Sequence, residues 1–587
     1  MAAKALIDSP ETVVTAAIDG LVSSNPHLAR LDGYPDIKVV IDATFDKSSS
    51  VAVISGGGSG HEPAMAGYVG RGMLAAAVCG EVFASPSEDA VLAAIRAVTG
   101  PAGCLLIVMN YTGDRLNFGA AAERAKVEGL KVEMVVTADD CALKAKAAVG
   151  RRGIAGTVLV HKIAGATAAA GGSLEEVKAA AEGAAASIGT MGASLSGCTV
   201  FGQPSSDRLG PQEFEMGLGI HGEPGAYRER MRPMSGIVDE MVSRIAGETD
   251  SYLPVEKGDR VVLLVNNLGS TTPLEMHGAA AAAARLVQSQ LNATVERLYI
   301  GPFMTSLGMH GLSVTLLRGA NEAIMKLLDA PTEAPAWPSA PAIYAPDKAP
   351  LPLPTGPNDE TEEQAAGAAA GSGTDTEQAQ TVRRCLEAAC RALHAAEAEL
   401  NALDGKVGDG DCGSTLAKGA SAIQAALQSG ALPLGDPAST ALALASLAGR
   451  SMGGTSGAIY KLCMTAAGAS LRQQGQQGLT LPAAAAALLA GVAAISKYGG
   501  AQLGDRTMLD ALGPAAEALN VMANDWQAAE AAADAAASAA EAGAEATCSM
   551  TAAAGRASYV PAEQQEGTPD PGARAVAIWL RAVANAL

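Results

Sequence analysis

A stretch without any regular apolar pattern divides this 587-residue sequence into two parts. Residues 330–379 are dominated by Pro, Ala, Gly and acidic side chains, with neither the alternation of a strand nor the spacing of an amphipathic helix. Such a segment cannot bury an apolar face, and its Pro-rich half is expected to be extended. We therefore predict a linker at 346–379, with separately folded units before and after it.

The part before the linker alternates apolar runs with Ala-rich stretches. This rhythm predicts βαβ units and an α/β unit with parallel-rich sheets. We expect two lobes, residues 1–190 and 191–345. Strands are predicted at 50–58, 103–114, 131–140, 156–165, 258–270 and 293–303, and helices at 87–100 and 117–129.

The part after the linker has almost no strand pattern. Apolar residues recur at helical spacing, with glycine breaks between the helical stretches. This predicts an all-α antiparallel bundle, or helical barrel, over residues 380–587. Its clearest helices are expected at 382–403, 439–452, 481–499 and 525–546.

Charge and cysteine content limit the classes of partner. Lys+Arg minus Asp+Glu is 41 − 61 = −20, which disfavours nucleic acid and anionic membranes as partners. The nine cysteines form no CxxC pair, which fits a reducing compartment. Asp8 and Glu11 interrupt any signal-peptide core, and the longest apolar run, 481–495, is too short for a membrane span. We expect a soluble cytoplasmic protein.

Three carboxylates crowd into the sequence LDGKVGDGDCGSTL, residues 403–416. Asp404, Asp409 and Asp411 repel one another unless a cation lies between them. Hard oxygen ligands in a small flexible loop suit Mg²⁺. The spacing excludes an EF-hand, and an acidic surface turn remains the alternative.

Several glycine-rich breaks in the helical part are weaker indications. GRSMGGTSGAIY, 449–460, has backbone N–H groups at a helix start that can attract phosphate. Arg506 and Arg556 can neutralise phosphate charge. Taken singly, each break is equally explained as a turn between helices.

In the α/β part, three polar loops follow predicted strands. They are ISGGGSGHEP (54–63) with His61, NYTGD (110–114) with Asp114, and FASPS (83–87) with Ser85. The carboxyl ends of parallel strands are where open α/β sheets bind ligands, so these side chains are expected to face one crevice. The alternatives are a buried core histidine and a helix N-cap.

Taken together, these motifs resemble those of dihydroxyacetone kinases. GGGSGHEP, NYTGDRLNFG, HKIAGA (161–166) and GLGIHGEPG (217–225) resemble the K domain, in this order. LDGKVGDGDCGSTL, MGGTSGAIY, GDRTMLDAL, GRAS and DPGA resemble the nucleotide-binding L domain. The resemblance covers about 10–345 and 380–587 and is to the ATP-dependent single-chain form, which includes triokinase/FMN cyclase.

The resemblance implies roles in the α/β unit. His221 would add to the ketone carbon of dihydroxyacetone as a hemiaminal, and its glycine neighbours would leave room for this small substrate. Asp114 and His61 would handle the proton of the hydroxyl that is phosphorylated. The remaining substrate contacts would come from Gly57, Gly58, Ser59, Gly60 and Ser85.

The resemblance also implies roles in the helical unit. Asp404, Asp409 and Asp411 would hold two Mg²⁺ that bridge the ATP phosphates. Phosphotransferase-type relatives often have His at position 412, and Cys412 agrees with an exchangeable ATP. The nucleotide would be bound by Asp411, Cys412, Gly413, Ser414, Ser456, Gly457, Gly500, Met508, Arg556, Asp570, Pro571 and Gly572.

One departure from the family pattern is Met109, where bacterial relatives often have Lys. The resemblance then implies loss of a charged contact and a broader triose preference that includes glyceraldehyde. It also implies a homodimer in which the L unit of one subunit serves the K unit of the other. Two alternatives stay open: cleavage of FAD to AMP and riboflavin cyclic 4′,5′-phosphate, with Mn²⁺ as an alternative metal, and a non-catalytic ketose sensor.

Overall fold

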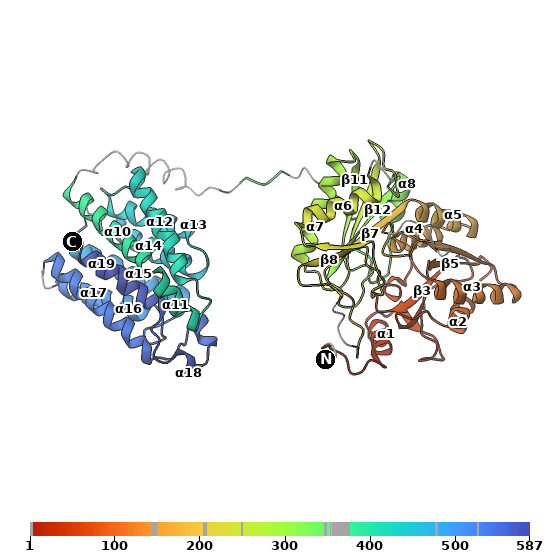
Figure 1. Ribbon diagram of the computed structural model, residues 1–587, viewed down its shortest axis with the longest axis horizontal. Helices are drawn as coiled ribbons and strands as arrows, with labels where there is room; N and C mark the ends of the chain where they lie inside the picture. Colours follow the sequence, from red (N-terminus) through yellow and green to blue (C-terminus); the bar gives the residue numbers. More distant parts are fainter. Residues whose placement is uncertain are drawn as a thin grey trace. The chain divides into compact units, whose positions relative to one another are not determined.

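The computed structural model describes residues 4–142, 150–203, 208–247, 251–345, 349–352, 354, 376–475, 479–524 and 528–587. The chain forms two compact units, residues 1–349 and 350–587, and each is described by itself (Figure 1). Most of the predicted linker lies outside the described residues, and helix α10 already begins at Glu377. The predicted fold class, an α/β unit followed by an all-helical unit, is confirmed.

The first sheet of the α/β unit is parallel at its centre. Its strand order is β1–β2–β4–β3–β5–β6, and β4, β3, β5 and β6 run parallel while β1 and β2 are antiparallel additions at one edge. One face packs on α2 and α3 and the other on α4 and α5. The bounds are α1 Val13–Ser24, β1 Leu28–Arg30, β2 Val39–Asp42, β3 Ala52–Ser59, β4 Ala76–Val82, α2 Glu88–Val98, β5 Cys104–Met109, α3 Thr112–Val127, β6 Val132–Thr137, α4 Thr157–Ala169 and α5 Leu174–Ala186.

The second sheet has the order β11–β10–β12–β7–β8–β9. Among its described strand pairs only β10–β11 is parallel, so the prediction of parallel-rich sheets is correct for the first sheet and wrong for the second. Short returns such as the one between β8 and β9 join antiparallel neighbours. The bounds are β7 Ile188–Ser194, β8 Glu213–Met216, β9 Tyr227–Arg230, α6 Met234–Ala246, β10 Arg260–Asn267, α7 Pro273–Ser289, β11 Thr294–Gly301, β12 Gly311–Arg318 and α8 Glu322–Leu328.

The segment 156–165, predicted as a strand, is helix α4, so that prediction is wrong. Every residue of this helix from Thr157 to Ala166 is buried. A helix buried on all sides has no polar face, and its apolar run then has the same appearance as a central strand.

All regular secondary structure in the described part of the second unit is helical. Successive helices pack on one another, and small alanine side chains make up much of its largest core. The bounds are α10 Glu377–Ala395, α11 Glu397–Val407, α12 Cys412–Ser429, α13 Pro437–Ser451, α14 Gly454–Gln474, α15 Leu481–Gly499, α16 Leu509–Asn524, α17 Ala529–Ala546, α18 Ala562–Gln565 and α19 Pro571–Ala584.

Helix α15 has its predicted bounds, and it extends beyond the apolar run 481–495. With 19 residues and a mean hydropathy of 1.5, it meets the length and composition of a membrane span, a test that the core helix of a soluble protein also passes. The prediction that this segment is too short to span a bilayer is therefore wrong in length.

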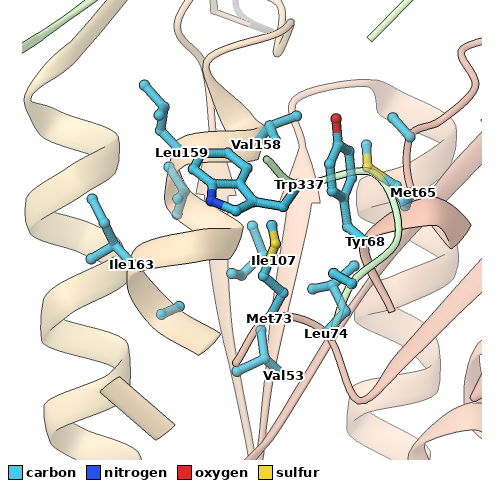
Figure 2. Close-up of a cluster of buried hydrophobic side chains, with 14 of the residues drawn as sticks. Val53, Met65, Tyr68, Met73, Leu74, Ile107, Val158, Leu159, Ile163 and Trp337 are labelled. Carbon is cyan, nitrogen blue, oxygen red and sulfur yellow. The ribbon is translucent and has the colours of Figure 1, made fainter. Parts of the chain in front are cut away.

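The start of the Pro-rich stretch, which lies before the predicted linker, packs on the α/β unit and buries Ala334 and Trp337. Residues 331–337 run along the 67–72 loop, where Glu333 N–H donates to the Arg71 carbonyl (3.0 Å) and Ala336 N–H to the Gly67 carbonyl (2.9 Å). Trp337 lies in the core, with its ring centroid 4.9 Å from that of Tyr299. Figure 2 shows the indole beside Val158 and Leu159 of α4. The burial of Trp337 thus anchors a segment whose Pro-rich composition gives no indication of packing.

Replacing Trp337 by Ala is expected to destabilise the α/β unit by about 3–5 kcal/mol, because the indole leaves a cavity that the core cannot fill. Urea unfolding of the full chain, followed by a probe specific to the α/β unit, measures the loss. The exposed neighbour Ser339, replaced by Ala, is the control. Equal midpoints for the two variants would contradict the structural role of Trp337.

Candidate active site

His221 lies in the loop between β8 and β9, and the glycines around it are fixed by backbone geometry. Gly217 and Gly222 have φ of +73° and +82°, which L side chains rarely adopt. At Gly219 a Cβ atom would lie 1.9 Å from Glu223 Oε2, and at Gly225 it would lie 2.4 Å from the Met216 carbonyl oxygen. The positive φ of Gly217 and Gly222 and the backbone contact at Gly225 require glycine at these three positions, whereas at Gly219 a side chain would displace the Glu223 carboxylate.

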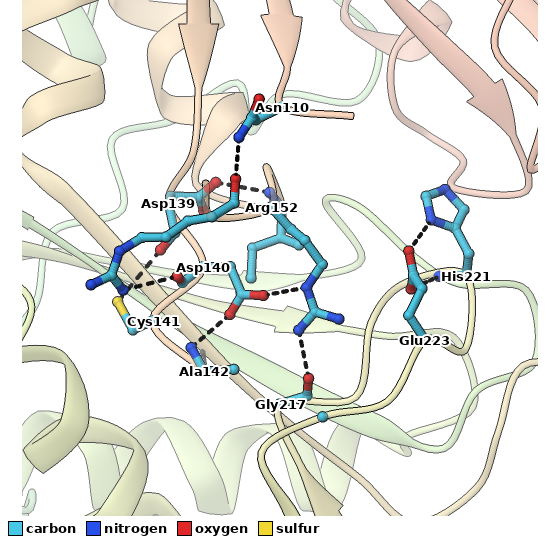
Figure 3. Close-up of polar contacts among 12 residues, drawn as sticks. Asn110, Asp139, Asp140, Cys141, Ala142, Arg152, Gly217, His221 and Glu223 are labelled. Carbon is cyan, nitrogen blue, oxygen red and sulfur yellow. Dashed lines mark hydrogen bonds and ion pairs between the residues drawn. The ribbon is translucent and has the colours of Figure 1, made fainter. Parts of the chain in front are cut away.

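Glu223 holds the imidazole of His221. Its Oε1 accepts from His221 Nδ1 at 2.7 Å, and its Oε2 accepts from the backbone N–H of the same residue at 3.0 Å (Figure 3). Burial raises the pKa of Glu223, but the hydrogen bond and charge of His221 outweigh it and lower that pKa to about 2. A carboxylate on Nδ1 fixes the Nδ1–H tautomer and leaves the lone pair on Nε2.

Three aromatic rings surround this imidazole. The centroids of Tyr111, His61 and Phe83 lie 4.8, 4.9 and 5.2 Å from that of His221. The His221 side chain is 22% exposed, whereas His61 is 1% exposed. The imidazole of His221 is therefore surrounded by aromatic rings and remains partly exposed to solvent.

His61 is a neutral base with one free nitrogen. Its Nδ1 lies 2.8 Å from the Thr305 carbonyl oxygen, so Nδ1–H donates, and Nε2 is buried without a hydrogen-bond partner. Burial, with the charge of His221 second, lowers the pKa of His61 to about 4. A core histidine with a purely structural role would have hydrogen-bond partners for both ring nitrogens, but here only Nδ1 has one.

Asp114 lies in the first turn of α3, behind the end of β5. It is 4% exposed, and its Oδ1 has no hydrogen-bond partner. Burial raises the pKa of Asp114, while a hydrogen bond from Ser85 and the charge of His221 lower it. The N-cap of α3 is Tyr111, so the alternative that Asp114 serves as the cap is wrong.

The glycine-rich end of β3 approaches its neighbours too closely for side chains. A Cβ atom on Gly58 would lie 2.8 Å from the backbone nitrogen of Ala84, and one on Gly60 would lie 2.7 Å from the Phe83 ring. The Ser59 hydroxyl donates to the Gly80 carbonyl at 2.8 Å. The structure thus brings the ends of β3, β4 and β5 together around His61 and Asp114, as the strand-end argument predicts.

A buried ionic network, which sequence reasoning missed, supports the His221 loop. Arg152 Nε donates to Asp140 Oδ2 at 2.6 Å, and Arg152 Nη2 donates to the Gly217 carbonyl at 2.8 Å (Figure 3). Asp139 accepts from the N–H groups of Ile154 and Gly156. These contacts join the two lobes beside the His221 loop. The adjacent Asp139–Asp140 pair following β6 was the available sequence signal.

In the helical unit, the three predicted metal ligands converge. One carboxylate oxygen from each of Asp404, Asp409 and Asp411 lies within 4.8 Å of the others. Asp404, in the last turn of α11, accepts from the N–H groups of Asp411 (2.9 Å) and Cys412 (3.1 Å) at the start of α12. Such a carboxylate set fits a hard divalent cation.

Asp570 lies close to Cys412 of this loop, and Arg506 lies close to Asp570. Asp570 caps α19, and burial raises its pKa to about 6, with Arg506 opposing the shift. Arg506 donates from Nη2 to the Thr568 carbonyl at 2.7 Å, while its buried Nε and Nη1 have no partner. Burial, with Asp404 and Asp570 next, raises the pKa of Cys412 to about 12. The unpartnered guanidinium nitrogens can meet an anion.

The other predicted nucleotide residues lie at helix ends. Ser456 and Gly457 are in the first turn of α14, and Gly500 is the C-cap of α15 with φ +77°. Pro571 and Gly572 begin α19. A Cβ atom on Gly572 would lie 3.3 Å from the Cβ atom of Met508. The side chain of Arg556 lies outside the described part of the structure, so its role stays a prediction.

Two of the predicted nucleotide residues have clear packing roles. Ser414 donates to Glu397 Oε1 and exchanges hydrogen bonds with Asn401 of α11. A Cβ on Gly413 would lie 2.1 Å from the Glu397 carbonyl oxygen. Both residues therefore fix α12 against α11, in addition to any contact with a nucleotide.

The depressed pKa of His61 predicts acid sensitivity of the α/β unit. A buried neutral histidine adds stability above its unfolded pKa of 6.5, and this stability is lost as the pH falls towards about 4. Relative to His61→Asn, the free energy of unfolding of the wild type should fall by about 3 kcal/mol over this interval, because the pKa of His61 is lower in the folded chain by 6.5 − 4 = 2.5. Urea unfolding at several pH values measures it, with the exposed His277→Asn as control. Parallel curves for wild type and His61→Asn would contradict the prediction.

The contact with Glu223 predicts the tautomer of His221. In ¹⁵N NMR spectra the wild type should show the Nδ1–H form, and Glu223→Ala should shift the population towards Nε2–H. Glu223→Gln, whose amide oxygen still accepts from Nδ1, should keep the wild-type form. An unchanged tautomer in Glu223→Ala would show that another group sets it.

Two family models match this chain. The Dak1 domain matches residues 19–336, which is most of the α/β unit, and the DAK2 domain matches residues 406–585 of the helical unit.

Several similar proteins match over nearly their whole length. The chain is 49% identical to a Solanum lycopersicum protein provisionally named 3,4-dihydroxy-2-butanone kinase, over 100% of this chain and 98% of that protein. It is 43% identical to human triokinase/FMN cyclase over 100% of both chains. The crystal structure of the Citrobacter freundii dihydroxyacetone kinase with AMP-PNP and Mg²⁺ is 39% identical over 100% of both chains, with a TM-score of 0.73.

Proposed function

The chain belongs to the family of single-chain dihydroxyacetone kinases with a Dak1 and a DAK2 domain, and on this premise we propose that it transfers the terminal phosphoryl group of ATP to dihydroxyacetone. The observation that carries the proposal is His221, whose Nδ1 is held by Glu223 while the neighbouring His61 and Asp114 present unpartnered acceptor atoms. Glyceraldehyde is a second proposed substrate.

The ketone is held covalently in this proposal. The Nε2 lone pair of His221 forms a bond to the carbonyl carbon, the C=O π bond breaks, and the carbonyl oxygen takes up a proton from the solvent that borders the ring. The Nδ1 proton can leave to Glu223 Oε1, 2.7 Å away, which keeps the hemiaminal neutral. Glycerol has no carbonyl group and cannot be held this way.

The substrate hydroxyl loses its proton to a neighbouring base. Asp114 Oδ1 and His61 Nε2 are both buried acceptors without partners, and burial keeps His61 neutral. Either atom can take the proton as the hydroxyl oxygen forms its bond to phosphorus and the bond to the leaving ADP oxygen breaks.

The helical unit supplies the nucleotide site in this proposal. Asp404, Asp409 and Asp411 fit a divalent cation, and we propose that they hold two Mg²⁺. When bound, Mg²⁺ neutralises phosphate charge and aligns the reacting phosphoryl group. Arg506, with two unpartnered nitrogens, and the start of α14 at Ser456 add cationic and N–H donors for phosphate.

Because the ketone and the nucleotide bind to different units, transfer requires the two to meet. We propose a homodimer in which the helical unit of one subunit serves the α/β unit of the other.

A second activity is suggested by the relative named triokinase/FMN cyclase. Here the nucleotide site would cleave FAD to AMP and riboflavin cyclic 4′,5′-phosphate, with Mg²⁺ or Mn²⁺. A ribityl hydroxyl attacks in place of the triose hydroxyl, so this reaction does not need His221.

His221→Ala separates the two activities. Loss of the nucleophilic nitrogen should reduce ADP formation with dihydroxyacetone by at least about 100-fold, the scale on which a covalent or acid–base group contributes. ATP binding and FAD cleavage should be unchanged. A coupled ADP assay, calorimetric ATP titration and product analysis with FAD measure these three quantities, and the exposed His277→Ala is the matched control.

Normal turnover of dihydroxyacetone by His221→Ala would overturn the covalent role. If the wild type forms the ketone adduct and binds ATP but transfers no phosphoryl group, a ketose-sensing function replaces the kinase. Removal of divalent cations by EDTA should abolish both activities, and Asp411→Asn should weaken them.

A further inference from the structure

The loop between β11 and β12, residues 302–310, contacts the two segments that carry His61 and His221. The Thr305 carbonyl accepts from His61 Nδ1 at 2.8 Å, and the Thr305 N–H donates to the His61 carbonyl at 3.1 Å. The Leu307 N–H donates to the Gly60 carbonyl at 2.9 Å. Backbone groups of this loop therefore hold the His61 segment directly.

Ser306 extends the contacts of the same loop to the His221 loop. Its hydroxyl donates to the carbonyl of Ile220, the residue before His221. Its backbone N–H donates to the Leu268 carbonyl at 2.8 Å, and the residue is fully buried. The backbone of Ser306 is thus fixed to the segment that follows β10, while its side chain holds the His221 loop.

A buried amide keeps this loop in place. Asn266 of β10 accepts through Oδ1 from the N–H groups of Phe303 (2.8 Å) and Met304 (2.9 Å), and its Nδ2 donates to the Met304 carbonyl at 2.7 Å. Leu307 has a φ of +51°, a conformation that a bulky residue keeps only where its surroundings enforce it. The loop is therefore a fixed support for the groups that it contacts.

The placement of the His221 ring decides where a ketone bound to it lies. Its centroid is 4.9 Å from that of His61, whose Nε2 is one of the two proposed proton acceptors. Ile220 is 4% exposed, so removal of the Ser306 hydroxyl leaves a buried carbonyl without this donor, which costs free energy. Movement of the loop towards another donor recovers part of that cost, and a displacement of about 1 Å at a reacting group is already costly for catalysis.

We propose that Ser306 is a positioning residue, which sets the place of the His221 imidazole relative to His61 by holding the Ile220 carbonyl. It acts through the backbone of the His221 loop and contacts neither the ketone nor the nucleotide. The consequence for ketone binding rests on the proposed function, whereas the position of the ring can be measured without any substrate.

Ser306→Ala should raise the KM for dihydroxyacetone by about tenfold, because a displaced imidazole forms the adduct less readily. The KM for ATP should not change, since the proposed nucleotide site lies in the helical unit. The matched control is Ser270→Ala, which removes a hydroxyl bond to the Gly308 carbonyl of the same loop (2.8 Å) and none to Ile220. It should keep both KM values.

The NMR signals of the His221 ring protons measure its position independently of turnover. Their chemical shifts depend on the three neighbouring aromatic rings, so Ser306→Ala should move them and Ser270→Ala should not. Thermal unfolding verifies that each variant is folded. Ser306→Cys, a weaker donor, carries both measurements if the Ala variant does not fold.

The inference is overturned if the folded Ser306 variant keeps either the wild-type ring signals or the wild-type KM for dihydroxyacetone. Equal changes in Ser270→Ala would also overturn it, because general loosening of the 302–310 loop would then be the cause. If the wild type does not turn over dihydroxyacetone, the proposed function fails, and the ring signals of the two variants alone decide whether Ser306 positions His221.

Discussion

The proposed ketone site depends on backbone segments that approach one another more closely than side chains allow. Glycines at the end of β3 and in the β8–β9 loop have backbone neighbours within 3 Å of where a Cβ would lie, as at Gly58 and Gly225. This packing leaves His221 enclosed by the rings of His61, Phe83 and Tyr111. A methyl group at either glycine would displace the imidazole or the loop that faces it.

Burial then sets the chemistry of the groups that this packing encloses. His61 is kept neutral with one free nitrogen, and Asp114 is buried with an unpartnered oxygen. Leaving buried polar atoms unsatisfied costs free energy, and such atoms concentrate where a ligand completes their hydrogen bonding. The Arg152–Asp140 pair nearby is hydrogen-bonded and serves to hold the loop, whereas the partnerless atoms of His61 and Asp114 lie at the proposed site.

In the helical unit, the candidate metal ligands come from residues that are close together in the sequence. Its three convergent carboxylates come from one helix–loop–helix segment, so sequence spacing alone predicted the cluster. Arg506 and Asp570 are 64 positions apart in the chain and reach the same neighbourhood only through packing of α16 and α19. Nothing in either local pattern indicates that two guanidinium nitrogens remain without partners.

The sequence by itself determined the division into an α/β and a helical unit, the strand-end loops and the carboxylate cluster, because each follows from local periodicity or spacing. Only the tertiary structure decided that 156–165 is a buried helix and that Trp337 anchors a Pro-rich segment, since an apolar run or a lone aromatic does not specify what surrounds it. It also decided the partner of His221 Nδ1 and the contact of Ser306 with the His221 loop. Tautomer, burial and hydrogen bonding are properties of the surroundings, and those come from distant parts of the chain.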